Sequence, residues 1–159
     1  MLKVSAVSVA MASLLGSAAI ASTPAVAAPV PPTPNASVSY QLGGDYGPEF
    51  ASGVVIRDST SSPIAGHYNI CYLNGFQTQA DQSKWWKRKH RNLLLRKGGR
   101  YVIDGQWNEI LLDTSTAKKR RAIARVVGTW TDSCAQTGFS AVEFDNLDSY
   151  QRSRGRLTK

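Results

Sequence analysis

The chain contains short runs of apolar and β-branched residues that end in acidic side chains. These runs are residues 53–58, which end in Asp58; residues 109–113, which end in Asp113; and residues 141–148, which contain Asp145 and Asp148. Nearly continuous apolar runs of this length are what parallel strands buried on both faces require. Residues 68–73 and 37–42 predict two further strands, which lead into Asn74 and Gly43.

A long amphipathic helix is predicted between two of these runs, over residues 116–137. Its apolar side chains recur at helical spacing: Ile123, Val126, Val127, Trp130 and Cys134. Ser115 or Thr116 supplies a side-chain cap at the start, and Gly138 supplies the left-handed position after the end. We therefore interpret residues 111–148 as strand, helix and strand with a right-handed parallel crossover, and we expect another helix over residues 83–90.

Repeated strand–helix units with acidic strand ends predict an α/β fold, either a barrel or a doubly wound sheet. No candidate strand is followed by the glycine fingerprint of a dinucleotide fold or by a phosphate loop. In a barrel, the carboxyl ends of the strands build the active site. We therefore expect four carboxylates to converge on one mouth: Asp58, Asp113, Asp145 and Asp148.

Such a set of carboxylates suits glycoside cleavage, which needs two carboxyl groups flanking the scissile bond. Asp145 and Asp148 are too close in sequence to form that opposed pair, so one of them pairs with a distant carboxylate and the other contacts sugar hydroxyls. Aromatic side chains could form platforms for the sugar rings: Tyr40, Tyr72, Trp85, Trp86 and Tyr150. The alternatives are structural, with the aromatics in the core and Asp58 and Asp113 in turns or caps.

Metal and serine chemistry fit the sequence less well. The only histidines, His67 and His90, are not spaced as a ligand pair, and no nucleophile elbow is present. We expect neither a metal nor a cofactor.

The N-terminal residues predict export. Residues 1–27 combine a positive start, an apolar stretch and a small-x-small site at Ala25–Ala27, which is typical of a cleaved signal peptide; an uncleaved anchor is the alternative. Residues 28–36 form a proline-rich spacer, and residues 37–159 form the folded domain. We expect a secreted, extracellular protein with no membrane association after cleavage. In an oxidising compartment Cys71 and Cys134 predict one disulfide, with two buried thiols as the alternative.

The net charge of +8 raises the question of an anionic partner. Cations crowd residues 84–100 and 118–121, but no nucleic-acid-binding signature accompanies them. We therefore expect no nucleic-acid partner. The charge fits a solvated surface or attraction to a cell wall, and a secreted carbohydrate- or wall-binding module without catalysis is the alternative function.

Four segments in fixed order resemble glycoside hydrolase family 114, the endo-α-1,4-polygalactosaminidase-like barrels, in a secreted bacterial branch. They are residues 39–44, 68–79, 111–113 and 143–150. The most specific segment is Glu-x-Asp-Asn-x-Asp-x-Tyr, from Glu143 to Tyr150. Phe144 departs from the family pattern, where proline is common.

The resemblance implies a (β/α)8 TIM-type barrel that hydrolyses α-1,4-linked galactosamine polymers without a cofactor. It implies that Asp145 is catalytic and that the substrate-binding positions are Asp148, Asn146, Asp58, Tyr72, Asp113 and Tyr150. A whole barrel needs roughly 200 residues or more, so this chain should hold only the first four or five strands. The family's later catalytic glutamate would lie beyond Lys159. We therefore expect the chain alone to be truncated and inactive; no sequence feature indicates its oligomeric state.

Overall fold

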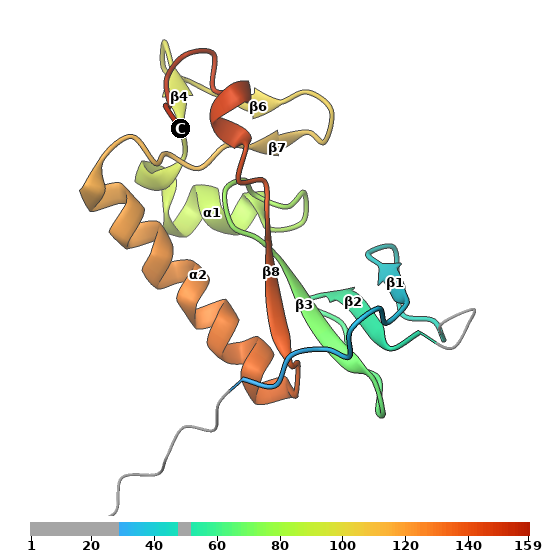
Figure 1. Cartoon of the computed structure of the whole chain (residues 1–159). Coiled ribbons are helices and arrows are strands. Elements are labelled where there is room, and N and C mark those ends of the chain that lie inside the picture. The colour runs from blue at the N-terminus through green and yellow to red at the C-terminus, as the bar shows by residue number, and fades with distance from the viewer. Residues whose placement is uncertain (1–28, 48–51) are drawn as a thin grey trace, which may run out of the picture.

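The computed structural model describes residues 29–47 and 52–159, and a parallel four-stranded sheet organises them (Figure 1). The strands are β1 (Val38–Gln41), β2 (Val54–Asp58), β3 (Tyr68–Asn74) and β8 (Ala141–Asp145), and they lie in the order β1-β2-β3-β8. All three neighbouring pairs are parallel. The α/β prediction is confirmed, and the sheet corresponds to four strands of a barrel. The predicted signal peptide, residues 1–27, lies outside the described residues.

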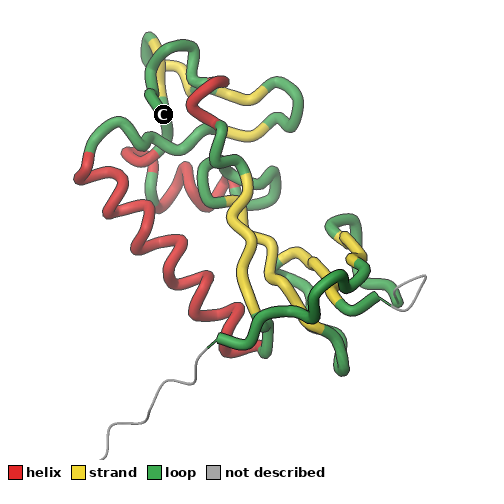
Figure 2. Tube along the Cα trace, viewed as in Figure 1, coloured by secondary structure: helices red, strands yellow, loops and turns green. Residues whose placement is uncertain are grey.

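The longest described helix, α2 (Ala117–Thr137), runs alongside β3 and β8 (Figures 1 and 2). Thr116 caps it, since its hydroxyl accepts a hydrogen bond from the Lys119 N–H at 3.2 Å. Gly138 ends it in the left-handed conformation, with φ of 100°. The predicted start and end of this helix are confirmed. Within the described residues no helix has both the length and the apolar character needed to cross a membrane.

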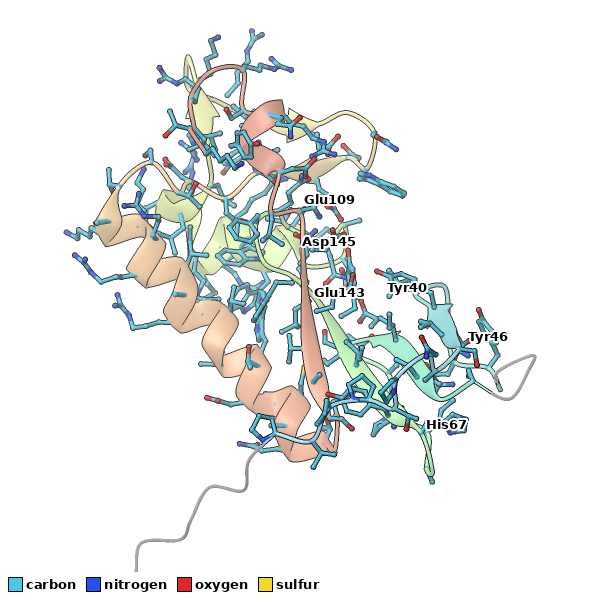
Figure 3. All side chains as sticks on the ribbon, viewed as in Figure 1. Tyr40, Tyr46, His67, Glu109, Glu143 and Asp145 are labelled. Atoms are coloured by element: carbon cyan, nitrogen blue, oxygen red, sulfur yellow. A yellow bond between two sulfur atoms is a disulfide. The ribbon has the colours of Figure 1, made fainter. Side chains whose placement is uncertain are left out.

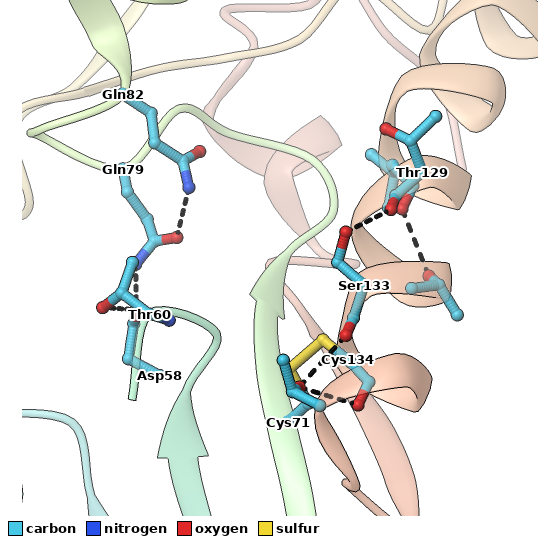
Figure 4. Close-up of a disulfide and its surroundings, with 11 residues drawn as sticks. Asp58, Thr60, Cys71, Gln79, Gln82, Thr129, Ser133 and Cys134 are labelled. Atoms are coloured by element: carbon cyan, nitrogen blue, oxygen red, sulfur yellow. Dashed lines mark hydrogen bonds between the residues drawn. A yellow bond between two sulfur atoms is a disulfide. The ribbon is translucent and has the colours of Figure 1, made fainter. Parts of the chain in front are cut away.

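A disulfide between Cys71 of β3 and Cys134 of α2 joins the sheet to this helix (Figure 4). Around it, Leu73, Phe139 and Trp130 complete an apolar cluster on this face of the sheet. Because side chains alternate along a strand, the same geometry turns Tyr72 and Asn74 to the opposite face.

The prediction of a parallel strand over residues 109–113 is wrong. β7 (Glu109–Ile110) pairs antiparallel with β6 (Ile103–Asp104), and isolated antiparallel bridges join Leu111 to Gln77 and Leu112 to Leu94. A second hairpin, β4 (Arg96–Lys97) with β5 (Arg100–Tyr101), precedes it. The apolar run is buried as expected, but short buried runs do not specify which partner covers them.

The crossover that leads into β8 therefore starts from β3 rather than from residues 109–113, and it is longer than predicted. It also contains α1 (Ser83–Lys89) and η1 (Arg91–Leu93), and the two hairpins lie beyond the carboxyl ends of β3 and β8 (Figure 1). The predicted helix over residues 83–90 is confirmed. Trp86 is fully buried there and packs against Trp130, so it belongs to the core rather than to a sugar-binding surface.

Candidate active site

The carboxyl end of β8 holds an aspartate whose two oxygen atoms are both bonded. The hydroxyl of Tyr72 donates to Oδ2 of Asp145 at 2.6 Å, and the N–H of Asn146 donates to Oδ1 at 2.6 Å. Asn146 lies in the left-handed region with φ of 65°, a conformation that asparagine adopts more readily than most residues. These contacts fix the orientation of the Asp145 carboxylate.

A second carboxylate on β8 lies on the same face, because Glu143 and Asp145 are two residues apart. The hydroxyl of Tyr40 donates to Oε1 of Glu143 at 3.0 Å, and the rings of Tyr40 and Tyr72 meet edge to face at 6.5 Å. Burial, then the hydrogen bond to Asp145, raises the pKa of Tyr72, and burial with the bond to Glu143 raises the pKa of Tyr40. Both phenols therefore stay protonated and act as donors.

A third carboxylate comes from the hairpin. Glu109 of β7 accepts a hydrogen bond from Nδ2 of Asn74 at 2.8 Å, and Asn74 lies opposite Asp145 in the register of β3 and β8. Burial raises the pKa of Glu109 to about 7; the Asn74 hydrogen bond opposes this rise, and the negative charges of Asp104, Asp145 and Asp81 add to it. Figure 3 shows Glu109, Asp145 and Glu143 in succession, with Tyr40 facing them from β1.

We call this group the carboxylate site: Tyr40, Tyr72, Glu109, Glu143 and Asp145. The sequence prediction included Asp145, Tyr72 and, as a candidate sugar platform, Tyr40. It missed Glu109 and Glu143 as site residues. Glu143 could have been found from its spacing, since it shares a strand face with Asp145. Glu109 begins its apolar run rather than ending it, so an argument from strand ends does not select it.

Asp58 lies at the carboxyl end of β2, opposite Tyr72 in the register. Its Oδ1 accepts hydrogen bonds from the N–H and hydroxyl of Thr60 at 2.9 and 2.8 Å. Its Oδ2 accepts from Nε2 of Gln79 at 2.6 Å (Figure 4). Asp58 therefore shapes the loop beside the carboxylate site.

Asp113 does not end a parallel strand, and the expectation that it shares a strand-end mouth with Asp145 is wrong. It precedes α2, where it pairs with Lys119 and accepts a hydrogen bond from the Ser115 N–H at 3.1 Å. Burial tends to raise the pKa of Asp113, but the hydrogen bonds from Lys119 and Ser115 outweigh it and hold the pKa below its ordinary value. The alternative interpretation of Asp113 as a turn residue before the helix describes these contacts.

The remaining predicted residues follow β8. Asn146 contacts Asp145 directly, as described above. Asp148 accepts a hydrogen bond from Nη1 of Arg152 at 2.7 Å, and the same arginine contacts Asp104 at 2.9 Å. Tyr150 packs against a cluster that includes Leu157, so its ring faces the core.

The described residues contain no group of three or more potential ligand side chains placed to hold a metal ion. The groups that the carboxylate site offers are three carboxyl groups and two phenols. Fold and site together define an α/β-barrel type of protein with carboxylates at the carboxyl ends of its strands.

The chain belongs to glycoside-hydrolase family GH114, whose model matches residues 19–159. The structure is similar to Ega3 of Aspergillus fumigatus, solved in complex with galactosamine, with a TM-score of 0.56 and 18% identity. It also matches a variant of the glycoside hydrolase domain of PelA from Pseudomonas aeruginosa, with a TM-score of 0.47 and 16% identity. These matches cover 77% and 76% of this chain and 49% of each solved chain, so the chain spans about half the length of both. A search of curated proteins found no match.

Proposed function

We propose that this chain is part of a glycoside hydrolase that cleaves an α-linked galactosamine-type polysaccharide, with Asp145 as a catalytic carboxylate. The observation that carries the proposal is the position of Asp145 at the end of a barrel strand, with one oxygen bonded to Tyr72 and the other to Asn146. Membership of family GH114 supports the reaction class. A galactosamine complex of the similar fold Ega3 supports the choice of sugar.

The chemistry follows from how Asp145 is held. Two donors fix the carboxylate plane, so it needs little reorientation either to attack the anomeric carbon of a sugar or to accept a proton from the water that attacks it. Glycoside hydrolysis also needs a second carboxyl group that protonates the leaving oxygen. The family resemblance assigns that role to a later glutamate and implies a position for it beyond Lys159. We therefore propose that this chain alone has little or no hydrolytic activity.

Sugar contacts are proposed for four polar side chains around Asp145. They are Asn146, Asp148, Asp58 and Tyr72. Tyr150 is a weaker candidate, because it packs against the apolar cluster that contains Leu95 and Leu157.

Export is part of the proposal. We propose that residues 1–27 are removed as a signal peptide, that residues 28–36 form a spacer and that residues 37–159 form the barrel portion of a secreted protein. The proline-rich composition of the spacer supports this division. Mass spectrometry of protein collected from the culture medium tests it, since the mature chain should begin at Ala28.

Binding and cleavage are tested on galactosamine oligosaccharides linked α-1,4. We expect the purified protein to bind them and to release few new reducing ends. Asp145→Asn should weaken binding, while Asp132→Asn, an exposed substitution on α2, should leave it unchanged. Rapid cleavage by the wild-type chain that is lost in Asp145→Asn would contradict the proposed inactivity and support a complete enzyme. Binding that Asp145→Asn leaves intact would favour a carbohydrate-binding module, and absence of binding would overturn the proposal.

A further inference from the structure

We propose that Glu109 is the specificity-determining residue of the carboxylate site and that it binds the ammonium group of an amino sugar lying against Asp145. The site would then select sugars with a free amine over N-acetylated ones. This inference rests on the function proposed above and adds the residue that recognises the amine.

The first argument is that Glu109 is built into the site. Its partner Asn74 is oriented in turn by the N–H of Gln77, which donates to Oδ1 of Asn74 at 2.9 Å. The side chain of the same Gln77 donates to Oδ1 of Asn146 at 3.1 Å, and Asn146 holds Asp145. Gln77 is fully buried. One buried residue thus fixes the asparagine partners of both carboxylates, so Glu109 and Asp145 are held relative to each other.

The second argument concerns the charge beside Glu109. Asp104 lies directly opposite Glu109 in the β6–β7 hairpin, and like charges in that position repel each other. The structure compensates Asp104 with Arg152, whose Nε lies 2.9 Å from Oδ2 of Asp104. Gln77 adds a donor to the same oxygen at 3.3 Å. No ion pair in the part of the chain that the structure describes includes Glu109.

The ion pairs found in residues 29–47 and 52–159 show the same difference between carboxylates that have a cation partner and those of the carboxylate site. They join Lys119 to Asp113, Arg152 to Asp104 and Arg152 to Asp148. None of them includes Glu109, Glu143 or Asp145, although the chain has 19 Lys and Arg against 11 Asp and Glu. Arg152 acts on Asp145 at longer range, but its direct ion pairs are with Asp104 and Asp148. A basic protein that leaves these three carboxylates out of its ion pairs fits a substrate that brings its own positive charge.

A bound ammonium would change the protonation of Glu109. Two groups of β3 act on Glu109: Asn74 through its hydrogen bond and Tyr72 through its hydroxyl. The charged groups are Asp145 from β8, Asp104 from β6 with its partner Arg152, and Asp81 from the segment before α1. Burial and these negative charges keep the pKa of Glu109 near 7, so a large share of the protein carries a neutral Glu109 just below neutral pH. An adjacent ammonium favours the ionised carboxylate, so binding should release the Glu109 proton to the solvent.

An N-acetylated sugar differs in two respects. Its amide carries no charge to stabilise the ionised carboxylate, and its acetyl group adds bulk where the ammonium would lie. A neutral Glu109 can still donate a hydrogen bond to such a sugar, but no proton is released. Proton release on binding therefore distinguishes recognition of an amine from general binding of a sugar.

The experiment is calorimetry on the purified protein at pH 6.5, in two buffers with different ionisation enthalpies. The ligands are a galactosamine oligosaccharide and its fully N-acetylated form, and the variants are Glu109→Gln and the exposed control Asp132→Asn. We expect wild type and Asp132→Asn to bind the amine form about tenfold more tightly, with release of part of one proton. Glu109→Gln keeps an acceptor for Asn74 but should lose both the preference and the proton release.

A carbon-13 titration of the Glu109 carboxyl group in wild-type protein removes any dependence on a variant that folds poorly. The amine oligosaccharide should shift its titration to lower pH, and the N-acetylated one should not. The contrary result is that both oligosaccharides bind without shifting the titration of Glu109, and that Glu109→Gln keeps the wild-type preference for the amine form. That result overturns the inference and leaves the proposed function standing. If neither oligosaccharide binds, the inference and the proposed function are overturned together.

Discussion

The hydroxyl of Tyr72 lies 2.6 Å from Oδ2 of Asp145, although the two residues are 73 positions apart in the sequence. They come from the neighbouring parallel strands β3 and β8, and in the register Tyr72 is opposite Glu143 rather than Asp145. The phenol thus reaches diagonally toward the carboxyl end of the sheet. This bond places a neutral donor on the proposed catalytic carboxylate without adding a cation that would compete with a positively charged sugar.

Tyr72→Phe removes that donor and leaves Asp145 with its bonds from Asn146. We expect affinity for galactosamine oligosaccharides to fall about tenfold, because a hydrogen bond to a charged group contributes about 1.5–3 kcal/mol. Binding calorimetry measures the change. Tyr101→Phe is the matched control, since the Tyr101 hydroxyl contacts Arg96 at 2.9 Å, outside the carboxylate site. An equal loss in both variants would show that the effect is not specific to Asp145.

Gln77→Leu tests the buried amide that contacts Asp104, Asn146 and Ser149. The substitution keeps the backbone N–H that orients Asn74 but removes three side-chain contacts. We expect the free energy of unfolding to fall by about 2 kcal/mol, because buried polar partners lose their hydrogen bonds. Urea denaturation measures this. In NMR spectra the side-chain amide of Asn146 should shift while that of Asn74 stays in place; a shift in both would mean that the whole loop has rearranged.

The sequence predicted the elements whose signals are local. The helix over residues 117–137 carries its own cap at Thr116 and its own stop at Gly138, so its bounds could be found without the rest of the fold. The strand that ends at Asp145 pairs only with β3 in the described sheet and is half-buried, with Phe144 exposed, but its run of apolar and β-branched residues was enough to predict a strand. The α/β class and the position of Asp145 at a strand end followed from these signals.

The hairpins could not be predicted in the same way. The run Ile110–Leu112 is as apolar as a barrel strand, but its partners are Gln77, Leu94 and the short strand β6. Pairing with distant segments is a tertiary property that a single apolar run does not encode. For the same reason Asp113 was assigned to the mouth, and Glu109, which the hairpin brings next to Asn74, was overlooked.

Glu109 should make stability depend on pH. Burial raises its pKa in the folded protein to about 7 from an ordinary 4.5, so folding favours the protonated form. The contribution of Glu109 to the free energy of unfolding is fully present below about pH 4.5 and is lost as the pH rises through about 7. We expect Glu109→Gln to remove this part of the loss of stability at high pH. The melting temperature of the variant minus that of wild type should therefore be larger at pH 8 than at pH 5. A constant difference across that range would contradict the raised pKa.

The disulfide between Cys71 and Cys134 closes a loop with a sequence separation of 63. In the chain-entropy description, opening a loop of that length costs about 4 kcal/mol of stability. We expect the double variant Cys71→Ser with Cys134→Ser to lose about that much in urea denaturation. Reduction of the wild type should have the same effect, and should have none on the variant.

Cys71 adjoins Tyr72 on β3, so looser attachment of this strand to α2 should also weaken sugar binding at temperatures where the protein is still folded. Unchanged affinity in the folded double variant would show that the hydrogen bonds around Asp145 alone are enough to keep Tyr72 in position.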